Sequence, residues 1–403
     1  MNIKLFTDIL NDKHFTDYKK MKYKYGESFQ EFLLNLEALY YKELPLKDFE
    51  NNLLVFIDNY KSINQVSVKL LLKSQTQKYG IKVAEDEIIS TSAIENIDFN
   101  RDSVRKILKG MAPENEQENR ILGLKHGLEF ISDTSNKITE ENLYKLYMMT
   151  VGEFLDKEDK LLNGNFYRHD TVFVISDHIE HAGLDHKKLP EYVNNLIKYI
   201  NSDDDTNDLI KASIIHFYFA FLHPYFDGNG RTARLLHLWF LIQKGYQSAL
   251  FIPFSSQIEK NKKEYYNAFT LIENNRKHSQ KIDVTPFIIY FAENVYGKMD
   301  VKNNNLEVLS LFENSLKNHI ITEKEAELWK FVLSYYGTNE FSTKQLEKDF
   351  GNAAYATIRA FVLKFCDLGI FTVTNYGARN KYKIKSDKWL TLVALFLIQC
   401  YFL

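Results

Sequence analysis

The sequence predicts a mainly helical protein, and three features of the chain support that fold class. Apolar residues recur at spacings of three and four, the pattern of an amphipathic helix, in segments such as FQEFLLNLEALYY at residues 29–41. Glycine and proline number only 16 and 6 in 403 residues, which argues against a protein built from many turns and strands. Before residue 300, one segment shows a clear strand pattern, at residues 164–183, and it predicts a small hairpin in a helical background.

We expect the first 80 residues to be helical as well. The segments FENNLLVFIDNY (residues 49–60) and INQVSVKLLLKSQTQKYG (residues 63–80) continue the apolar spacing, and Gly80 suits the end of a helix. The next helix is expected from about Glu85 to Glu95. Asn96 follows it, and asparagine tolerates the left-handed conformation in which many helices end.

The middle of the chain continues the helical pattern. Thr139 is a good N-cap, because acidic residues follow it in the first turn of the predicted helix. Further helices are predicted within residues 189–201, 208–226, 231–246, 261–275 and 284–299.

A change of composition at GKMDVKNNNLE marks a domain boundary near residue 300. Beyond it, three helical segments precede two alternating runs that meet at the turn NYGARN, which is the pattern of a winged helix-turn-helix. We therefore expect an N-terminal helical region (1–83), a core (84–300), and a winged helix-turn-helix domain with an apolar C-terminal segment (301–403).

Charge and cysteine content exclude several classes of protein. Lys and Arg number 51 against 53 Asp and Glu, so the chain is no polycation and has no strong electrostatic attraction to nucleic acid. Its cysteines, Cys366 and Cys400, make no disulfide framework, and a cytoplasmic location without a signal peptide is expected. The apolar segment WLTLVALFLIQCYFL is shorter than the roughly 20 residues that span a bilayer. We expect it to form a buried helix or an oligomer contact, with no membrane partner.

The stretch HPYFDGNGRTAR, from His223 to Arg234, concentrates the chemistry of the chain. Its glycines let successive N–H groups turn toward one point and form an anion nest, to which the N-terminus of the following helix adds its dipole. Arg231 and Arg234 lie three residues apart, so both project from one side of that helix and suit phosphate oxygens.

Two more residues of the stretch suit a reaction at phosphate. Asp227 offers an oxygen ligand to a magnesium ion that phosphates share, and His223 takes a proton near neutral pH. Each feature alone has an ordinary explanation, as a turn, a core histidine or a solvated arginine. Their ordered combination instead predicts phosphoryl or nucleotidyl transfer.

The stretch resembles the motif of the Fic family, which reads His-Pro-Phe, any residue, Asp or Glu, Gly-Asn-Gly-Arg, any two residues, Arg. The chain departs from it only at Tyr225, which replaces phenylalanine and is expected to pack in the interior. The resemblance implies a Fic-type helical bundle that uses Mg²⁺ and transfers AMP from ATP to a Ser, Thr or Tyr hydroxyl of a target protein. It makes His223 the base and Asp227 the Mg²⁺ ligand. The residues that it implies for binding the ATP phosphates are Gly228, Asn229, Gly230, Arg231 and Arg234.

The predicted hairpin, at about residues 164–178, resembles the flap that Fic proteins carry over the active site. The resemblance rests on Gly164, Phe166, Tyr167 and Arg168, which precede its first strand. The flap is thought to hold the backbone of the target by strand addition. The residues that would contact the target are Val172, Phe173 and Val174.

The segment TSAIEN resembles the inhibitory helix of many Fic proteins, with Thr91, Glu95 and Asn96 at the positions of the pattern. The resemblance implies that Glu95 pairs with Arg234, and a buried pair of this kind resists separation because either partner left alone is costly. ATP would then bind with its α-phosphate out of line for attack, and a displacement of about 1 Å costs roughly 100-fold in rate. The inhibitory helix, at about residues 85–96, would lie in the same chain as the site that it inhibits.

Several questions stay open at the level of sequence. Tyr265 and Tyr266 are both candidates for the adenine pocket, and Tyr266 is preferred. The resemblance suggests a homodimer. The protein itself is one candidate for the target that is modified. One alternative is a de-AMPylase that uses Glu95 to help a water molecule remove AMP. Another is a DNA-binding regulator, in which the winged helix contacts DNA and the Fic core senses a nucleotide.

Overall fold

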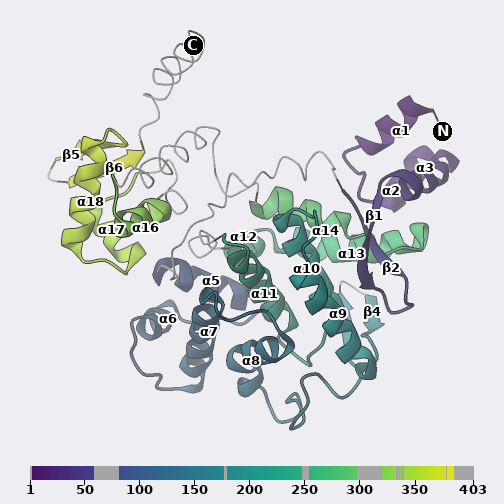
Figure 1. Cartoon of the computed structure of the whole chain (residues 1–403), viewed down its shortest axis with the longest axis horizontal. Helices are drawn as coiled ribbons and strands as arrows, with labels where there is room; N and C mark the ends of the chain where they lie inside the picture. The colour runs from purple at the N-terminus through teal and green to yellow at the C-terminus, as the bar shows by residue number, and fades with distance from the viewer. Residues whose placement is uncertain are drawn as a thin grey trace.

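The computed structural model describes residues 2–58, 81–176, 179–246, 254–296, 320–332, 336, 340–377 and 379–384. These residues form a central body of helices, with the N-terminal helices at one end and a smaller C-terminal domain at the other (Figure 1). The prediction of a mainly helical protein is confirmed, because the strands among the described residues only pair into two-stranded hairpins.

The N-terminal part combines three helices with a hairpin. Its elements are α1 (Ile3–Leu10), α2 (Tyr18–Tyr25), α3 (Glu27–Leu39), β1 (Tyr41–Lys47) and β2 (Leu53–Ile57). The helices bury a small core of their own, to which Phe29, Phe32 and Leu36 contribute from one face of α3. This is the face that the spacing of three and four in the sequence predicts.

The prediction of a helix over residues 49–60 is wrong, because β2 lies inside that segment and pairs with β1 in antiparallel fashion. Val55 also donates its N–H to the Ile282 carbonyl at 3.0 Å and accepts from the Val284 N–H at 2.8 Å. The run LLVFI is thus enclosed by neighbours on both sides. A short continuous apolar run fits a buried strand as well as a buried helix, and its length favours the strand. The segment at residues 63–80 lies outside the described residues.

Ten helices of the described chain make up the central body. They are α5 (Ile81–Ile94), α6 (Arg101–Leu108), α7 (Glu116–Ser132), α8 (Glu140–Thr150), α9 (Leu189–Asn201), α10 (Asp208–Leu222), α11 (Asn229–Gln243), α12 (Phe254–Lys260), α13 (Lys262–Ser279) and α14 (Thr285–Tyr290). Short helical turns lie at Gly152–Phe154, His186–Lys188 and Phe291–Val295. Almost every residue of α10 and α11 is buried, and the two helices pack against each other at the centre of the body.

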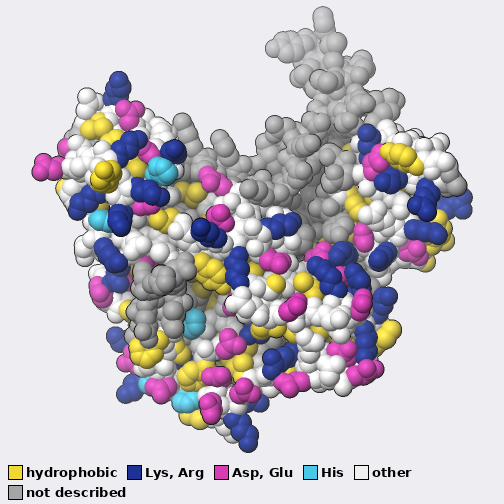
Figure 2. All heavy atoms as spheres, turned by 180° about the vertical axis from the view of Figure 1, so that it is seen from behind, with side chains coloured by type: hydrophobic (Ala, Val, Ile, Leu, Met, Phe, Trp, Pro, Cys, Tyr) yellow, Lys and Arg dark blue, Asp and Glu magenta, His cyan; other side chains and the backbone are white. Residues whose placement is uncertain are grey.

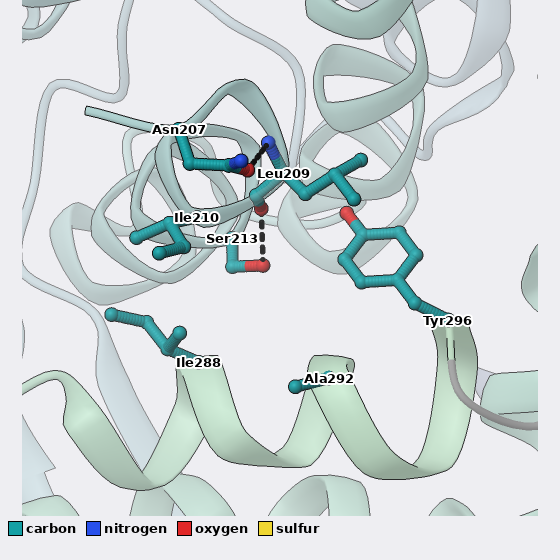
Figure 3. Close-up of a pocket in the computed structure, with 7 residues that line it drawn as sticks. All are labelled: Asn207, Leu209, Ile210, Ser213, Ile288, Ala292 and Tyr296. Atoms are coloured by element: carbon teal, nitrogen blue, oxygen red, sulfur yellow. Dashed lines mark hydrogen bonds between the residues drawn. The ribbon is translucent and has the colours of Figure 1, made fainter. Parts of the chain in front are cut away.

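Polar caps fix where several of these helices begin. Thr139 accepts a hydrogen bond from the Asn142 N–H at 3.2 Å, which confirms its prediction as the N-cap of α8. Asn207 caps α10 in the same way through the Leu209 N–H. A cavity of about 10 Å³ lies at this end of α10. Figure 3 shows the residues that line it, among them Leu209 and Tyr296. The cavity has room for about one water molecule and lies at the opposite end of α10 from His223.

The predicted hairpin forms where the alternating pattern placed it. Strand β3 (Phe173–Ser176) pairs in antiparallel fashion with β4 (Ile179–Ala182), and Phe173 lies opposite Ala182. The Gly183 N–H continues the pairing by donating to the Val172 carbonyl at 2.8 Å.

The C-terminal domain has the predicted order of three helices and a hairpin. Its elements are α16 (Glu323–Phe331), α17 (Thr343–Phe350), α18 (Tyr355–Asp367), β5 (Phe371–Tyr376) and β6 (Arg379–Ile384). Trp329, Phe365 and Phe371 meet in its interior, where the rings of Trp329 and Phe365 are 4.5 Å apart. The predicted boundary near residue 300 and the apolar C-terminal segment lie outside the described residues. No helix in the described part of the chain is long and apolar enough to cross a membrane.

Candidate active site

The stretch from His223 to Arg234 forms the tight connection between α10 and α11. His223 ends α10 in the left-handed conformation (φ 50°), and Gly228 adopts a left-handed φ of 77° just before α11. A Cβ atom on Gly228 would lie 2.5 Å from a methyl group of Val151, so the position has neither the backbone freedom nor the space for another residue. The stretch therefore runs from the end of α10 through a tight loop directly into the first turn of α11.

Asn229 stabilises this connection through its side chain. Its amide oxygen accepts from the Tyr225 N–H at 2.9 Å, and its amide nitrogen donates to the Tyr225 carbonyl at 2.8 Å. The side chain is thereby committed to the loop, which leaves the backbone N–H groups of the first turn to face a ligand. The ring of Tyr225 is fully buried and stacks on Tyr147 with ring centres 3.5 Å apart, in keeping with its expected packing position.

His223 has the protonation state that a base requires. Burial lowers the pKa of His223 to about 4, and the positive charge of Arg168 acts in the same direction. The negative charges of Asp227 and Glu95 oppose this shift without cancelling it. At neutral pH the ring is thus uncharged and has a nitrogen that can accept a proton.

Asp227 and Arg231 form an ion pair across one turn, with 2.8 Å between Nη2 and Oδ2. Arg231 is mostly buried, whereas the carboxylate of Asp227 is half exposed and open to a ligand. Among the described residues, no group of three or more His, Cys, Asp or Glu side chains gathers into a metal site. Mg²⁺ commonly uses one or two carboxylates together with substrate phosphates, so Asp227 fits this mode of binding.

Arg234 is fully buried and directed at α5. Its Nε donates to Thr91 Oγ1 at 2.8 Å, and its Nη2 donates both to the Thr91 carbonyl at 3.0 Å and to Glu95 Oε1 at 2.7 Å. Its Nη1 lacks a hydrogen-bond partner. The structure therefore brings Arg234 against Thr91 and Glu95, which precede it by 143 and 139 residues in the sequence.

The carboxylate of Glu95 lies directly over the first turn of α11. A Cβ atom on Gly230 would lie 2.4 Å from Glu95 Oε1, so only glycine leaves room for the carboxylate at this position. Burial raises the pKa of Glu95, but Arg234, Arg231 and Lys262 outweigh that effect and the pKa is lowered overall. An ionised carboxylate thus fills the place at a helix N-terminus that suits an anion.

The end of α5 is fastened by a second set of contacts. Asn96 adopts a φ of 59°, as expected for a residue at a helix end, and its Oδ1 accepts from Lys262 Nζ at 2.8 Å. The Tyr266 hydroxyl lies 3.4 Å from the Ile94 carbonyl, whereas Tyr265 is buried and bonds to His216 at 2.9 Å. Tyr266 is thus the tyrosine that borders α5, and its role toward adenine stays a prediction.

The flap residues are placed in part. The Phe173 side chain is 63% exposed and that of Val172 is half-buried, so both are near the surface of the hairpin. The side chain of Val174 lies outside the described set. The sequence pattern marked Arg168 only as part of the flap, yet its Nε donates to the carbonyl of His223 at 2.8 Å. Nothing in the sequence around Arg168 signals this contact, because it depends on how the segment packs against the end of α10.

The chain is similar to known proteins over the segment that holds this site. Residues 137–241 match the sequence model of the Fic/DOC family. A protein adenylyltransferase Fic of Nematostella vectensis is 29% identical over 181 residues, which are 44% of this chain and 38% of the relative. A protein adenylyltransferase Fic of Drosophila ananassae is 24% identical over 191 residues, which are 46% of this chain and 34% of the relative. The match thus spans little more than a third of these relatives.

Solved structures of Fic proteins are also similar to the chain. A Fic family protein from Desulfovibrio desulfuricans G20 aligns over 76% of this chain and 88% of its own, with 18% identity and a TM-score of 0.45. Fic-1 from C. elegans (aa134–508) aligns over 78% and 86%, with 17% identity and a TM-score of 0.44. The family match at residues 137–241 includes the whole stretch from His223 to Arg234, so the likeness to the Fic/DOC family covers the candidate site itself.

Proposed function

We propose that the protein is an adenylyltransferase that moves AMP from ATP to a Ser, Thr or Tyr hydroxyl of a target protein, and that Glu95 inhibits it from within the chain. The observation that carries the proposal is the position of the Glu95 carboxylate, which pairs with Arg234 and covers the first turn of α11 beside His223. A carboxylate in this place competes with a phosphate group for the same donors.

The residues of the site account for the chemistry step by step. Uncharged His223 accepts the proton of the target hydroxyl, whose oxygen then attacks the α-phosphorus of ATP. The bond between the α-phosphorus and the bridging oxygen breaks, and pyrophosphate leaves. Asp227 would hold Mg²⁺, which supplies positive charge to the phosphates. Donors already fixed at the first turn of α11 and on Arg231 stabilise the charge that develops.

The inhibited state follows from the competition for Arg234. With Glu95 in place, Nε and Nη2 of Arg234 are bonded to Thr91 and Glu95, and Nη1 is buried, so the terminal phosphate of ATP competes with the carboxylate for this guanidinium. ATP that binds regardless is displaced, so its α-phosphorus lies away from His223. Release of Glu95 gives Arg234 to the γ-phosphate and aligns the reacting atoms.

The first prediction concerns the label that is transferred and the residues that control it. With α-labelled ATP and Mg²⁺ in a native lysate, Glu95→Gly incorporates at least tenfold more label into protein than the wild type, whereas with γ-labelled ATP the two incorporate the same amount. The double variant Glu95→Gly with His223→Ala is the matched control and incorporates no label. The proposal is wrong if Glu95→Gly transfers no α-label to any protein, its own chain included.

A second candidate function is removal of AMP from a modified protein. The observation in its favour is that Glu95 stays ionised beside the base, with a side chain 28% exposed, and an ionised carboxylate can activate a water molecule. An AMP-modified protein distinguishes the two functions. A de-AMPylase loses activity in Glu95→Gly, whereas the transferase gains it.

A further inference from the structure

Arg168 is a buried cation in the segment that leads into the hairpin β3–β4. Its side chain is 2% exposed, and its hydrogen bonds go to backbone carbonyl oxygens rather than to carboxylates. A charged group removed from water is costly unless its hydrogen-bonding capacity is satisfied. The hydrogen bonds of Arg168 therefore offset the free-energy cost of burying its charge.

Two of these contacts hold the residue that carries the base. Nε donates to the His223 carbonyl at 2.8 Å, and the backbone N–H of Arg168 donates to the next carbonyl, that of Pro224, at 3.0 Å. His223 has a left-handed φ of 50°, which is uncommon for a residue with a side chain. Arg168 thus grips the backbone at the point where it departs from the common conformations.

The other contacts hold both ends of the hairpin. Nη1 donates to the Asp170 carbonyl at 2.7 Å, ahead of β3, and Nη2 donates to the Leu184 carbonyl, after β4. Gly183 leaves room for the guanidinium, because a Cβ atom there would lie 3.1 Å from Nη2. One planar group therefore connects the two ends of the hairpin with the backbone of His223.

We propose that Arg168 is a positioning residue that sets the orientation of the His223 ring relative to a target hydroxyl held at the hairpin β3–β4. This inference rests on the proposed transferase function. The backbone of His223 fixes where the ring can point, and the ends of the hairpin fix where an added target strand would lie. Because the same guanidinium donates to both, a change in its shape shifts the two relative to each other.

The fork shape of arginine is essential to this role. Three of its nitrogens reach three carbonyls in different directions, whereas the ammonium of lysine is a compact charge on a flexible stem. Arg168→Lys therefore keeps the charge and loses part of the geometry, and Arg168→Gln loses both.

The experiment measures α-label transfer and nucleotide binding in the Glu95→Gly background. We expect Arg168→Gln to lower the transfer rate about 100-fold, the cost typical of a displacement near 1 Å, and Arg168→Lys to fall between it and arginine. The affinity for Mg²⁺ and α,β-methylene ATP stays within about threefold, because Arg168 donates to no phosphate-binding residue of the stretch. Arg276→Gln is the matched control, because Arg276 pairs with Asp48 and Glu50 beside the hairpin β1–β2. This variant should leave the transfer rate unchanged.

Two results would overturn the inference. One is a transfer rate in Arg168→Gln within threefold of its parent, and the other is a loss of nucleotide affinity as large as the loss of rate. If Glu95→Gly itself transfers no label, the proposed function fails separately. Crystal structures of the wild type and Arg168→Gln then decide the inference, which requires His223 to leave its left-handed conformation and is refuted if His223 stays in place.

Discussion

At the scale of single residues, the protonation of His223 has a measurable consequence. Its pKa of about 4 lies below that of an ordinary histidine because the ring is buried and Arg168 is near. In the proposed reaction the uncharged ring is the base, so activity that depends on it is full above the pKa and is lost as the pH falls through it. The sign is opposite to that of a site in which a charged histidine acts.

We therefore predict that the rate of α-label transfer hardly changes as the pH is lowered from neutral toward 5.5. The α-label transfer rate of Glu95→Gly at saturating ATP changes less than twofold between pH 8 and pH 5.5. A rate that halves near pH 6.5, where exposed histidines titrate, would contradict the burial of His223 as the controlling effect. The folded fraction, followed by circular dichroism over the same range, is the control.

Glu95 and Arg234 give a second prediction, on the terminal phosphate alone. When Glu95 is removed, Arg234 is a buried cation that keeps only Thr91 as partner, and the γ-phosphate of ATP supplies the missing anion. ADP lacks that phosphate. In Glu95→Gly, Mg-ATP should therefore raise the unfolding temperature more than Mg-ADP, by several degrees near saturation.

The wild type serves as the comparison for this prediction. There Glu95 occupies Arg234, so Mg-ATP and Mg-ADP should raise the unfolding temperature by similar amounts. Arg234→Ala in the Glu95→Gly background should abolish the excess effect of ATP. An excess of the same size in the wild type would mean that Glu95 does not compete with the γ-phosphate.

At the scale of elements, the sequence predicted those helices whose caps and spacing are local. The end of α5 and the start of α8 agree, since Asn96 and Thr139 act within one turn of their own helices. Strand β2 was missed although its hairpin partner β1 directly precedes it; its other partner, at residues 282–284, lies far along the chain. Tertiary contacts of this kind override a local apolar run.

The candidate site divides in the same way. The stretch from His223 to Arg234 could be interpreted because its residues are contiguous, and the family pattern supplied Thr91 and Glu95. The closeness of Glu95 to Gly230 and the contacts of Arg168 could not be predicted, because each depends on how distant segments pack. Contacts of this kind arise from the tertiary fold, and no pattern of residues in the sequence predicts them.

The surface of α18 bears on the alternative of DNA binding. Arg359 and Lys364 are the basic residues of this helix; Arg359 is exposed, whereas Lys364 pairs with Glu325 at 2.7 Å. A helix that enters a DNA groove needs basic side chains free to meet phosphates. On the face that Figure 2 displays, basic and acidic side chains are interspersed rather than separated. DNA binding by this helix therefore stays an untested alternative, for which Arg359 is the exposed basic side chain that α18 offers.

At the scale of the whole molecule, α5 connects the site with the C-terminal domain. Every side chain described from residue 82 to residue 95 is at least partly buried, as in a helix enclosed by other elements. Its C-terminal end reaches Arg234 on α11, while α12 and α6 pack along it and α17 of the C-terminal domain contacts it as well (Figure 1). Buried apolar residues of the body and the C-terminal domain also form one continuous cluster.

Under the proposed function, the contact between α5 and α17 couples the C-terminal domain to the inhibitory helix. If α5 withdraws as a unit to free Arg234, it also has to part from α17. On α17, mostly buried Asp349 has two charged residues of α5, Lys82 and Asp86, among its electrostatic neighbours and accepts a hydrogen bond from Tyr336 at 2.7 Å. A partner that draws the C-terminal domain away would thus release Glu95 by linkage between the two sites.

The last prediction tests this connection by charge reversal at Asp349. Asp349→Lys places a positive charge near Lys82 and should raise α-label transfer in the wild-type background severalfold, whereas Asp349→Asn, which keeps an acceptor for Tyr336, should raise it less. Asp367→Lys, at an exposed position on α18, is the matched control and should change nothing. In the Glu95→Gly background Asp349→Lys should add no further increase, because the inhibition that it weakens is already absent. An equal increase in both backgrounds would show that the C-terminal domain acts on catalysis in general and does not hold the inhibitory helix.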